Sequence, residues 1–475
     1  MENILEKLQN IAVLVAIHYI CNMQKIKVVI VAALLFAVSA ITWGRSPKYV
    51  FYFIGDGMGI NQTAVTENYM RAMGMGDLNF RHFPVATFIT THSASSLVTD
   101  SAAAGSALAT GVKFDNKSIS MLPDSTIVET VAEKASKCGY GVGILTTDAY
   151  NMATPAAFSA HNVVRNSYDD IIEWQVTKPV ADFAAGSTLT SKQGKRDEWI
   201  ELAKANGIKV FSGGEKYTPV RGGKVMYLSN NLNESDLAYS LDRKDGDRTL
   251  MEYTGAALDY LYSNFRNGFF LMVECGAIDH SCHSRDAASA VGDIMDLAAC
   301  VDRALEFYAK HPDETLIIVT SDHETGGLVI SGDHPEVLAN QKCTINALTA
   351  ALTELAERGS DVPWSTVKGV IGDLTGLWKT VPVSEREERA LTALYKETFL
   401  DCSSEDVKDL YHSNKKMAVE VIRYLDSKAG VVFTQGGHSG APVGLYVKGA
   451  RASEFGVCRD NTDVPKVIMK VAGYK

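Results

Sequence analysis

The sequence predicts an α/β fold, a three-layer sandwich in which helices cover both faces of a central, mostly parallel sheet. Apolar runs that look like buried strands alternate along the chain with segments whose apolar residues recur at helical spacing. Because the strand-like runs are continuously apolar, each strand is expected to be buried on both faces, as in a parallel sheet. The 475 residues, of which 46% are hydrophobic, are enough for a large core.

Four apolar runs predict strands, at residues 49–54, 141–146, 269–273 and 316–320. Between the last two, apolar residues from Val291 to Tyr308 recur at helical spacing, which completes a strand–helix–strand unit. Residues from about 335 to 430 are polar and periodic, and helices are predicted at 348–356, 385–396 and 404–425. We interpret this segment as a helical insertion in a single domain that spans residues 45–475.

The N-terminus predicts a leader over residues 1–40. Lys25 and Lys27 precede an apolar run at 28–41, and the small residues at 38–40 fit signal-peptidase cleavage after Ala40. Met23, just before the basic pair, is the expected translation start. Residues 11–20 are also apolar, so an uncleaved anchor is the alternative, while a buried helix is disfavoured at a basic-flanked terminus. We favour a cleaved signal peptide and export to the periplasm or cell envelope, with secretion as a further destination.

The charge and cysteine content exclude two classes of protein. A net charge of −10 and a pI of about 5.6 argue against a nucleic-acid binder held by a broad basic surface. The eight cysteines form no CxxC pair and no dense disulfide framework. Cys275 and Cys282 lie among candidate metal ligands, but their neighbours supply enough ligands, so both are interpreted as buried packing residues.

Carboxylates and imidazoles follow the predicted strands, at the sheet edge where open α/β sheets place their sites. Most of these carboxylates and imidazoles follow the last two predicted strands, namely Glu274, Asp279, His283, Asp322 and His323. Asp and His suit zinc, whereas Glu suits magnesium, and several divalent ions together indicate phosphate chemistry. His438 stands in the glycine-rich turn at 435–443 and is the expected third ligand of a zinc that also binds Asp279 and His283.

Ser101 opens an alanine-rich segment that favours helix, so it lies at a predicted helix start. Taken alone, such a serine is most often an N-cap. The free N–H groups of a helix N-terminus attract an anion, however, and a nearby metal would create a serine alkoxide. Asp100 is expected to orient a cation, and Arg165 to grip two phosphate oxygens. His161 is interpreted as structural. Five further histidines lack a ligand-like context: His82, His92, His311, His334 and His412.

Taken together, these residues resemble the alkaline phosphatase family from Asp56 to His438. Each motif is only moderately specific, but all of them in one order with compatible gaps are highly specific. The motifs are Gly55-Asp56-Gly57-Met58-Gly59, Thr99-Asp100-Ser101-Ala102-Ala103, Ala153-Thr154-Pro155, Glu274 with Asp279 and His283, Asp322-His323, and Gly437-His438.

The resemblance implies hydrolysis of a broad range of phosphate monoesters through a phosphoserine on Ser101, with Arg165 as the phosphate clamp. It implies two zinc ions and one magnesium ion, and makes a homodimer a candidate assembly. The implied ligands are Asp279, His283 and His438 for one zinc, Asp56, Asp322 and His323 for the other, and Asp56, Thr154 and Glu274 for magnesium. The bridging role of Asp56 and the role of Thr154 come from the resemblance alone.

Two positions and the insertion depart from the family pattern. Met152 stands where bacterial relatives carry Asp and animal relatives His, and a thioether orders magnesium-bound water poorly. His280 resembles the animal pattern, not the Lys of the best-known bacterial form. The insertion before His438 is longer than expected, so the usual dimer interface is not carried over.

Three alternative functions were weighed. A sulfatase is disfavoured because Ser101 is followed by three alanines, not by the Pro and Arg of a Cys/Ser-x-Pro-x-Arg motif. A phosphodiesterase usually lacks an Arg clamp, so Arg165 counts against it. A zinc-binding envelope protein without turnover would not need both Ser101 and Arg165.

Overall fold

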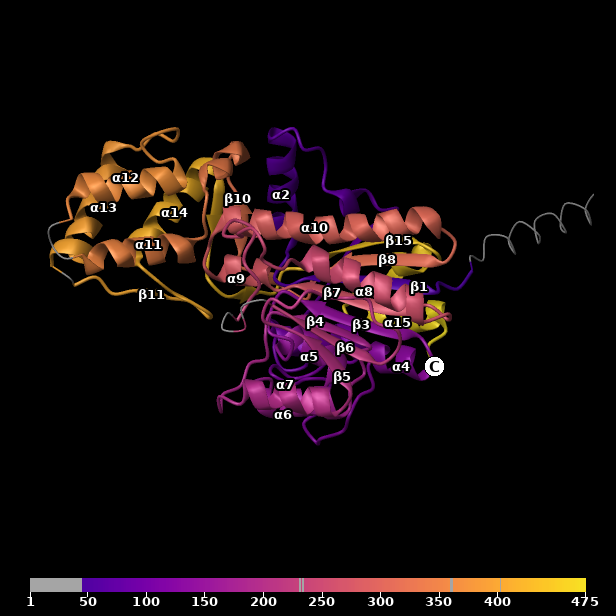
Figure 1. Ribbon diagram of the computed structural model, residues 1–475. Helices are drawn as coiled ribbons and strands as arrows, with labels where there is room; N and C mark the ends of the chain where they lie inside the picture. The colour runs from indigo at the N-terminus through magenta and orange to yellow at the C-terminus, as the bar shows by residue number, and fades with distance from the viewer. Residues whose placement is uncertain (1–44, 230–231, 233–234, 359–361, 402) are drawn as a thin grey trace, which may run out of the picture. The chain divides into compact units, whose positions relative to one another are not determined.

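A nine-stranded sheet forms the centre of the computed structural model, which describes residues 45–475 except 230–231, 233–234, 359–361 and 402 (Figure 1). The leader predicted for residues 1–40 lies outside the described residues. Across the sheet the strands are β2 (Val85–Ile89), β15 (Val443–Gly449), β8 (Thr315–Thr320), β1 (Tyr49–Gly55), β7 (Phe269–Cys275), β3 (Gly141–Thr146), β4 (Phe183–Gly186), β6 (Lys224–Leu228) and β5 (Ile208–Phe211). All neighbouring pairs are parallel except those of β15, which runs antiparallel to β2 and β8. The predicted fold class is confirmed, and the four predicted strands are β1, β3, β7 and β8.

The register of the four central strands brings their carboxyl ends to one level. Ile54 of β1 is paired with Glu274 of β7 on one side and with Thr320 of β8 on the other. Glu274 is also paired with Thr146 of β3. Side chains that follow these strands therefore emerge at the same edge of the sheet.

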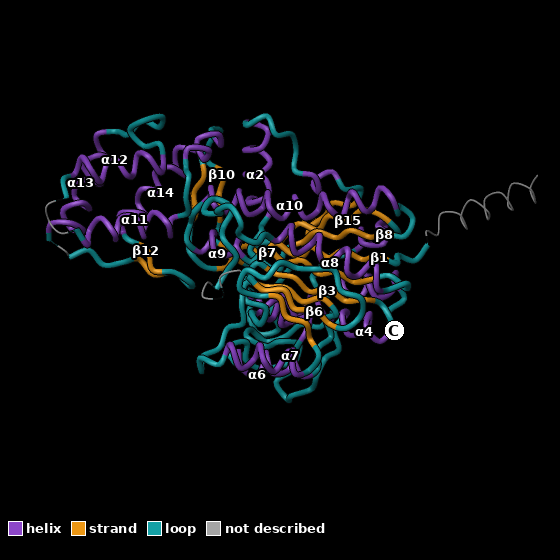
Figure 2. The backbone as a smooth tube through the Cα atoms, in the orientation of Figure 1, coloured by secondary structure: helices purple, strands orange, loops and turns teal. Residues whose placement is uncertain are grey.

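Helices cover both faces of the sheet (Figure 2). Alternate residues of each strand point to opposite faces, so both faces present apolar side chains on which helices pack. In β1, Val50 and Tyr52 belong to one buried cluster, and Phe51 and Phe53 to the other. The first cluster packs beneath α3 (Ser101–Thr110), α4 (Val131–Lys137), α5 (Ala153–Ser159), α6 (Tyr168–Thr177), α7 (Arg196–Ala205), η4 (Ala452–Val457) and α15 (Asp463–Ala472). The second packs beneath η1 (Asn79–His82), α8 (Leu250–Asn264), α9 (Ala277–His283) and α10 (Ala287–Lys310). Burying one such large apolar side chain contributes about 1.5–3 kcal/mol.

Smaller elements lie beside the sheet. Helix α2 (Ile60–Ala72) contacts α10. The two-stranded pairs are β9 (Glu324–Thr325) with β14 (His438–Ser439), and β10 (Leu328–Ile330) with β13 (Val431–Phe433). Residues 46–475 form one compact unit. None of the helices among the described residues combines the length and the apolar character that crossing a membrane requires.

Residues 335–430 carry a helical layer with a buried cluster of its own, which includes Leu352, Leu391 and Val421. Its elements are η2 (Pro335–Asn340), α11 (Ile345–Glu357), α12 (Trp364–Thr375), α13 (Glu385–Tyr395), η3 (Lys396–Leu400), β11 (Val407–Lys408), β12 (Ser413–Asn414) and α14 (Lys416–Ala429). The helix predicted at 404–425 is wrong in its first half, where β11 and β12 form an antiparallel hairpin. The reason is local, because the Asp409 carboxylate accepts the backbone N–H groups of Tyr411 and His412 and closes a turn.

Gly268, which leads into β7, generates a stability prediction. Its φ is +110°, and an added Cβ would lie 1.9 Å from the carbonyl oxygen of Lys48. Gly268→Ala should lower the free energy of unfolding by about 3 kcal/mol, because backbone strain and a backbone clash combine. Urea denaturation of the purified protein measures this loss.

Gly255 is the matched control, since it lies inside α8 with nothing within 4 Å of an added Cβ. Gly255→Ala should raise the free energy of unfolding by about 0.5–1 kcal/mol through helix propensity. Equal stabilities for the two variants would contradict this account of the turn before β7.

Candidate metal centre and nucleophile

The candidate ligands from four strand ends meet at one edge of the sheet. Atoms of Asp56, Asp322 and His323 lie within 4.8 Å of one another, and so do atoms of Asp279, His323 and His438. His323 belongs to both groups, so the two groups adjoin. The structure thus brings together residues that are up to 382 positions apart in the sequence, from Asp56 to His438.

Two imidazoles turn one nitrogen toward this centre and anchor the other. Nδ1 of His283 lies 2.6 Å from the carbonyl oxygen of Gly436, and Nδ1 of His438 lies 2.9 Å from that of Thr99. A carbonyl can only accept, so each Nδ1 carries a proton and Nε2 is the nitrogen that faces the centre. The two Nε2 atoms lie 3.1 Å apart. In their deprotonated form, both nitrogens are placed to bind a cation.

The carboxylates at the centre lack compensating positive charge of their own. Oδ1 of Asp56 and Oδ2 of Asp322 are buried, and neither has a hydrogen-bond partner among the residues that the structure describes. Burial, and then the charge of Asp322, raises the pKa of Asp56 well above its usual range. Burial raises the pKa of Asp322 to about 7. Such a buried acidic set is costly unless cations neutralise it, so this donor set fits divalent metal ions.

Asp279 is the exception among the acids. Burial would raise its pKa, but the imidazoles of His283 and His438 outweigh that effect and hold it well below the usual range. Oδ2 of Asp279 lies 3.4 Å from Nε2 of His283, and its Oδ1 lies 3.8 Å from Nε2 of His438. An ionised carboxylate beside two imidazole nitrogens is a donor set that suits zinc.

A third, all-oxygen group adjoins Asp56. The Thr154 hydroxyl lies 3.5 Å from Oδ2 of Asp56. Glu274 is buried, and its carboxylate accepts the hydroxyl of Thr146. Burial, and then the charge of Asp148, raises the pKa of Glu274. Two carboxylates and a hydroxyl are the hard oxygen ligands that magnesium prefers.

Ser101 lies directly against this centre. Its hydroxyl oxygen is 3.1 Å from Nε2 of His323, and the residue is 2% exposed. The N-cap of α3 is Asp100, whose carboxylate accepts the N–H of Ala103, so the alternative in which Ser101 caps the helix does not hold. The Ser101 side chain is therefore not occupied in capping the helix.

Asp100 also holds Arg165. Nη1 of Arg165 lies 3.2 Å from Oδ2 of Asp100. Asp100 accepts two further hydrogen bonds from the backbone N–H of Lys117, which fix its position. Both side chains are mostly buried. The guanidinium is thereby fixed beside the N-terminus of α3, where N–H groups and the helix dipole attract an anion.

The two departures from the family pattern stand within two residues of a candidate ligand, Met152 before Thr154 and His280 after Asp279. Met152 is the N-cap residue of α5, and no side-chain hydrogen bond caps this helix. His280 lies between Asp148 and Asp236, with nitrogen–oxygen distances of 3.5 and 3.3 Å. Burial would lower the pKa of His280, but the two carboxylates outweigh it and raise the pKa to about 10. His280 is therefore a cation paired with these two acids. His161 bonds the Ser120 carbonyl and Glu133, a structural role.

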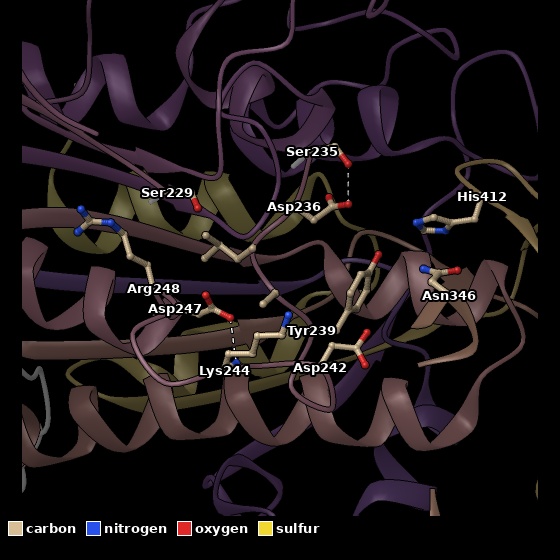
Figure 3. A pocket seen from close by; sticks show the side chains of 12 residues that line it. Ser229, Ser235, Asp236, Tyr239, Asp242, Lys244, Asp247, Arg248, Asn346 and His412 are labelled. Carbon is tan, nitrogen blue, oxygen red and sulfur yellow. Dashed lines mark hydrogen bonds between the residues drawn. The ribbon is translucent and has the colours of Figure 1, made fainter. Parts of the chain in front are cut away.

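Sequence reasoning missed several residues that border the site. Thr325 donates its hydroxyl to Asp279, and Tyr411 bonds the other oxygen of the same carboxylate. Asp236, which pairs with His280, lines a cavity of about 440 Å³ together with His412. Figure 3 shows both side chains at this cavity. Thr325 stands two residues after His323, a signal that could have been read. Nothing in the local sequence marks Tyr411, which is 132 residues from Asp279.

Comparison with known proteins extends over nearly the whole chain. The alkaline phosphatase family model matches residues 47–219 and 182–474. Alkaline phosphatase 3 of Bacillus subtilis is 27% identical over 441 residues, which cover 90% of this chain and 89% of that protein. Alkaline phosphatase 4 of the same organism is 28% identical over 384 residues, which cover 79% and 76%.

Solved structures share the fold. A cold-active alkaline phosphatase from a psychrophilic Shewanella species superposes with a TM-score of 0.75 at 25% identity, covering 89% of this chain and 99% of that one. The alkaline phosphatase of Thermus thermophilus gives a TM-score of 0.74 at 24% identity, covering 91% and 93%.

Removal of divalent cations should destabilise the protein, because the buried carboxylates then repel one another. A chelator is expected to lower the Tm by roughly 3–4 °C for each ion removed, since a ligand at 100 to 1,000 times its Kd contributes about 3–4 kcal/mol. Added zinc with magnesium should restore the Tm. Differential scanning calorimetry measures both shifts.

His438→Ala should shrink the chelator-induced shift, whereas His334→Ala should leave it unchanged, since His334 is exposed and pairs with Glu336. A Tm that is insensitive to chelator in the wild-type protein would refute the metal centre.

Proposed function

Because this chain belongs to the alkaline phosphatase family, we propose that it hydrolyses phosphate monoesters through a phosphoserine intermediate on Ser101, at a site that holds two zinc ions and one magnesium ion. That it is a phosphatase follows from the family. The metal stoichiometry and the intermediate are the parts proposed. The observation that carries them is the Ser101 hydroxyl, buried 3.1 Å from Nε2 of His323 at the N-terminus of α3.

The residues of the chain account for binding and attack. Arg165, held by Asp100, grips two phosphate oxygens, and the first N–H groups of α3 bind another. The Ser101 oxygen then attacks phosphorus from the side opposite the ester oxygen, which leaves as the alcohol after taking a proton. A water molecule next attacks the phosphoserine, releases phosphate and returns a proton to Ser101. The sum is one monoester and one water converted to one alcohol and one phosphate.

The metal ligands divide into three sets around Ser101. When bound, the divalent cations would lower the pKa of the serine hydroxyl and of the attacking water, and they would stabilise the negative charge on the leaving oxygen. The sets proposed are Asp279, His283 and His438 for one zinc, Asp56, Asp322 and His323 for the other, and Asp56, Thr154 and Glu274 for magnesium. The anchored imidazoles and the unpartnered carboxylate oxygens support the two zinc sets.

Further features are part of the same proposal. A broad substrate range follows from recognition that centres on the phosphate group. Export to the periplasm or cell envelope and assembly as a homodimer are also proposed, from the predicted leader and from the family respectively. A monoesterase is favoured over a diesterase because the fixed Arg165 guanidinium matches a doubly charged phosphate.

The central prediction concerns substrate class and nucleophile together. The zinc- and magnesium-loaded protein should release p-nitrophenol from p-nitrophenyl phosphate far faster than from the corresponding diester or sulfate ester. Ser101→Ala should lower turnover of the monoester on the order of 10³-fold or more, because the nucleophile is lost. Acid-quenched protein should carry phosphate on the peptide that contains Ser101, as mapped by mass spectrometry.

Ser136→Ala on α4 is the control and should retain wild-type turnover. Phosphate found on Thr99 or Ser106, or undiminished turnover in Ser101→Ala, would contradict the phosphoserine. Faster turnover of the diester or the sulfate ester would contradict the substrate class.

Met152 generates a separate prediction about magnesium. A carboxylate at this position would hydrogen-bond magnesium-bound water, and such partners change metal affinity by roughly 10- to 100-fold. A thioether is a weak acceptor without charge. Met152→Asp should therefore lower the magnesium concentration needed for half-maximal activity at fixed zinc.

Met152→Leu removes the sulfur without adding charge and is the matched control, expected to behave as the wild type does. Equal half-saturating magnesium concentrations for all three proteins would show that position 152 has no influence on magnesium.

A further inference from the structure

The hairpin β11–β12 extends from the insertion to the helix that carries two candidate zinc ligands. That helix, α9, contains Asp279 and His283 and has Ser284 as its C-cap. The Ser284 hydroxyl donates to Oδ2 of Asp409 at 2.7 Å, which ties the tip of the hairpin to the end of α9. The insertion therefore borders the metal centre, although it supplies none of the proposed metal ligands.

The hairpin is held in a defined shape. Oδ1 of Asp409 accepts the N–H of Tyr411 at 2.8 Å and that of His412 at 2.6 Å. Lys415 pairs with Asp406 at 2.9 Å across the open end of the hairpin. The Asp409 side chain fixes the turn, and the Lys415–Asp406 ion pair closes the other end of the hairpin. A side chain that lies between these two points is therefore held in a defined position.

That side chain is Tyr411, which lies over the ligand helix. Its hydroxyl donates to Oδ2 of Asp279 at 3.1 Å. Its ring centroid is 3.7 Å from that of His280 and 5.3 Å from that of His283. Tyr411 thus combines a hydrogen bond to one ligand with ring contacts to the same helix.

Asp279 is held from both sides by hydroxyl groups. Thr325, next to the ligand pair Asp322 and His323, donates to Oδ1, while Tyr411 donates to Oδ2. Each carboxylate oxygen has two acceptor positions, so one remains free on each oxygen for a cation. Partners of this kind orient a metal ligand, and their loss typically costs 10- to 100-fold in metal affinity or activity.

We propose that Tyr411 is a positioning residue that fixes the Asp279 carboxylate for metal binding, so that the insertion completes the catalytic site. The proposal rests on the metal centre of the proposed function.

Tyr411→Phe tests the hydrogen bond alone, because it keeps the ring contacts with His280 and His283. Zinc loss from the zinc-loaded, full-length protein is followed with excess chelator and a chromogenic zinc indicator. The variant should lose the less tightly held zinc about 10-fold faster than the wild type, and its kcat/KM for p-nitrophenyl phosphate should fall by a similar factor. The unfolding midpoint of the metal-free protein should not change, which separates positioning from a loss of fold.

Two further variants sharpen the test. Tyr424→Phe alters another mostly buried tyrosine of the insertion, on α14, which stacks with Arg423, and should match the wild type in both measurements. Asp409→Ala frees the turn while keeping Tyr411 and should also accelerate zinc loss. Combining it with Tyr411→Phe should add little, because both changes act through one hydrogen bond.

The outcomes separate this inference from the proposed function. Wild-type zinc release and kcat/KM in Tyr411→Phe would overturn the inference while leaving the phosphatase intact. A wild-type protein that binds zinc but does not hydrolyse monoesters would refute the function, and zinc release would still decide the role of Tyr411. A wild-type protein that binds no zinc would overturn both.

Discussion

The structure depends on positive charge that offsets the repulsion among a cluster of buried carboxylates. Asp56, Asp322, Asp279 and Glu274 are all buried at the edge of the sheet, each 4% exposed or less. Without positive charge, burial alone would force several of them to bind protons, and the pKa of Asp322 accordingly rises to about 7. Divalent cations remove this penalty and turn an unstable arrangement into a binding site. The same cations attract a phosphate group, because the phosphate is negatively charged as the carboxylates are.

The parallel sheet is what allows such a cluster to form at all. Because β8, β1, β7 and β3 run in the same direction and in aligned register, four independent chain segments deliver their next residues to one place. The apolar strands bury both faces, so the site rests on a rigid support. Helix α3 then starts at the same edge and contributes the remaining positive field, through N–H groups and not through a net charge.

The sequence revealed those features that depend on local pattern. The strands that flank the site were long and continuously apolar, and Asp322 and His323 follow one of them directly, so both strand and site could be predicted. Short strands such as β4, which reads Phe-Ala-Ala-Gly, carry too little pattern to be recognised. The sequence predicts a helix at 404–425, but its first half forms the β11–β12 hairpin, because the Asp409 side chain competes for backbone N–H groups. Contacts between distant segments, such as Tyr411 with Asp279, leave no local signal.

The insertion shows that metal-ligand motifs identify the ligands of a site but not the residues that orient those ligands. Ligand identity can be read from residue type, because few side chains bind zinc or magnesium. Ligand orientation depends on neutral partners, and hydroxyls such as those of Thr325 and Tyr411 are common everywhere in a sequence. Asp279 shows the difference, since its charge is supported by His283 and His438 whereas its orientation is set by two hydroxyls from unrelated segments. A segment without a single ligand can therefore tune a metal centre, and insertions that differ between relatives can alter metal retention while the ligands stay the same.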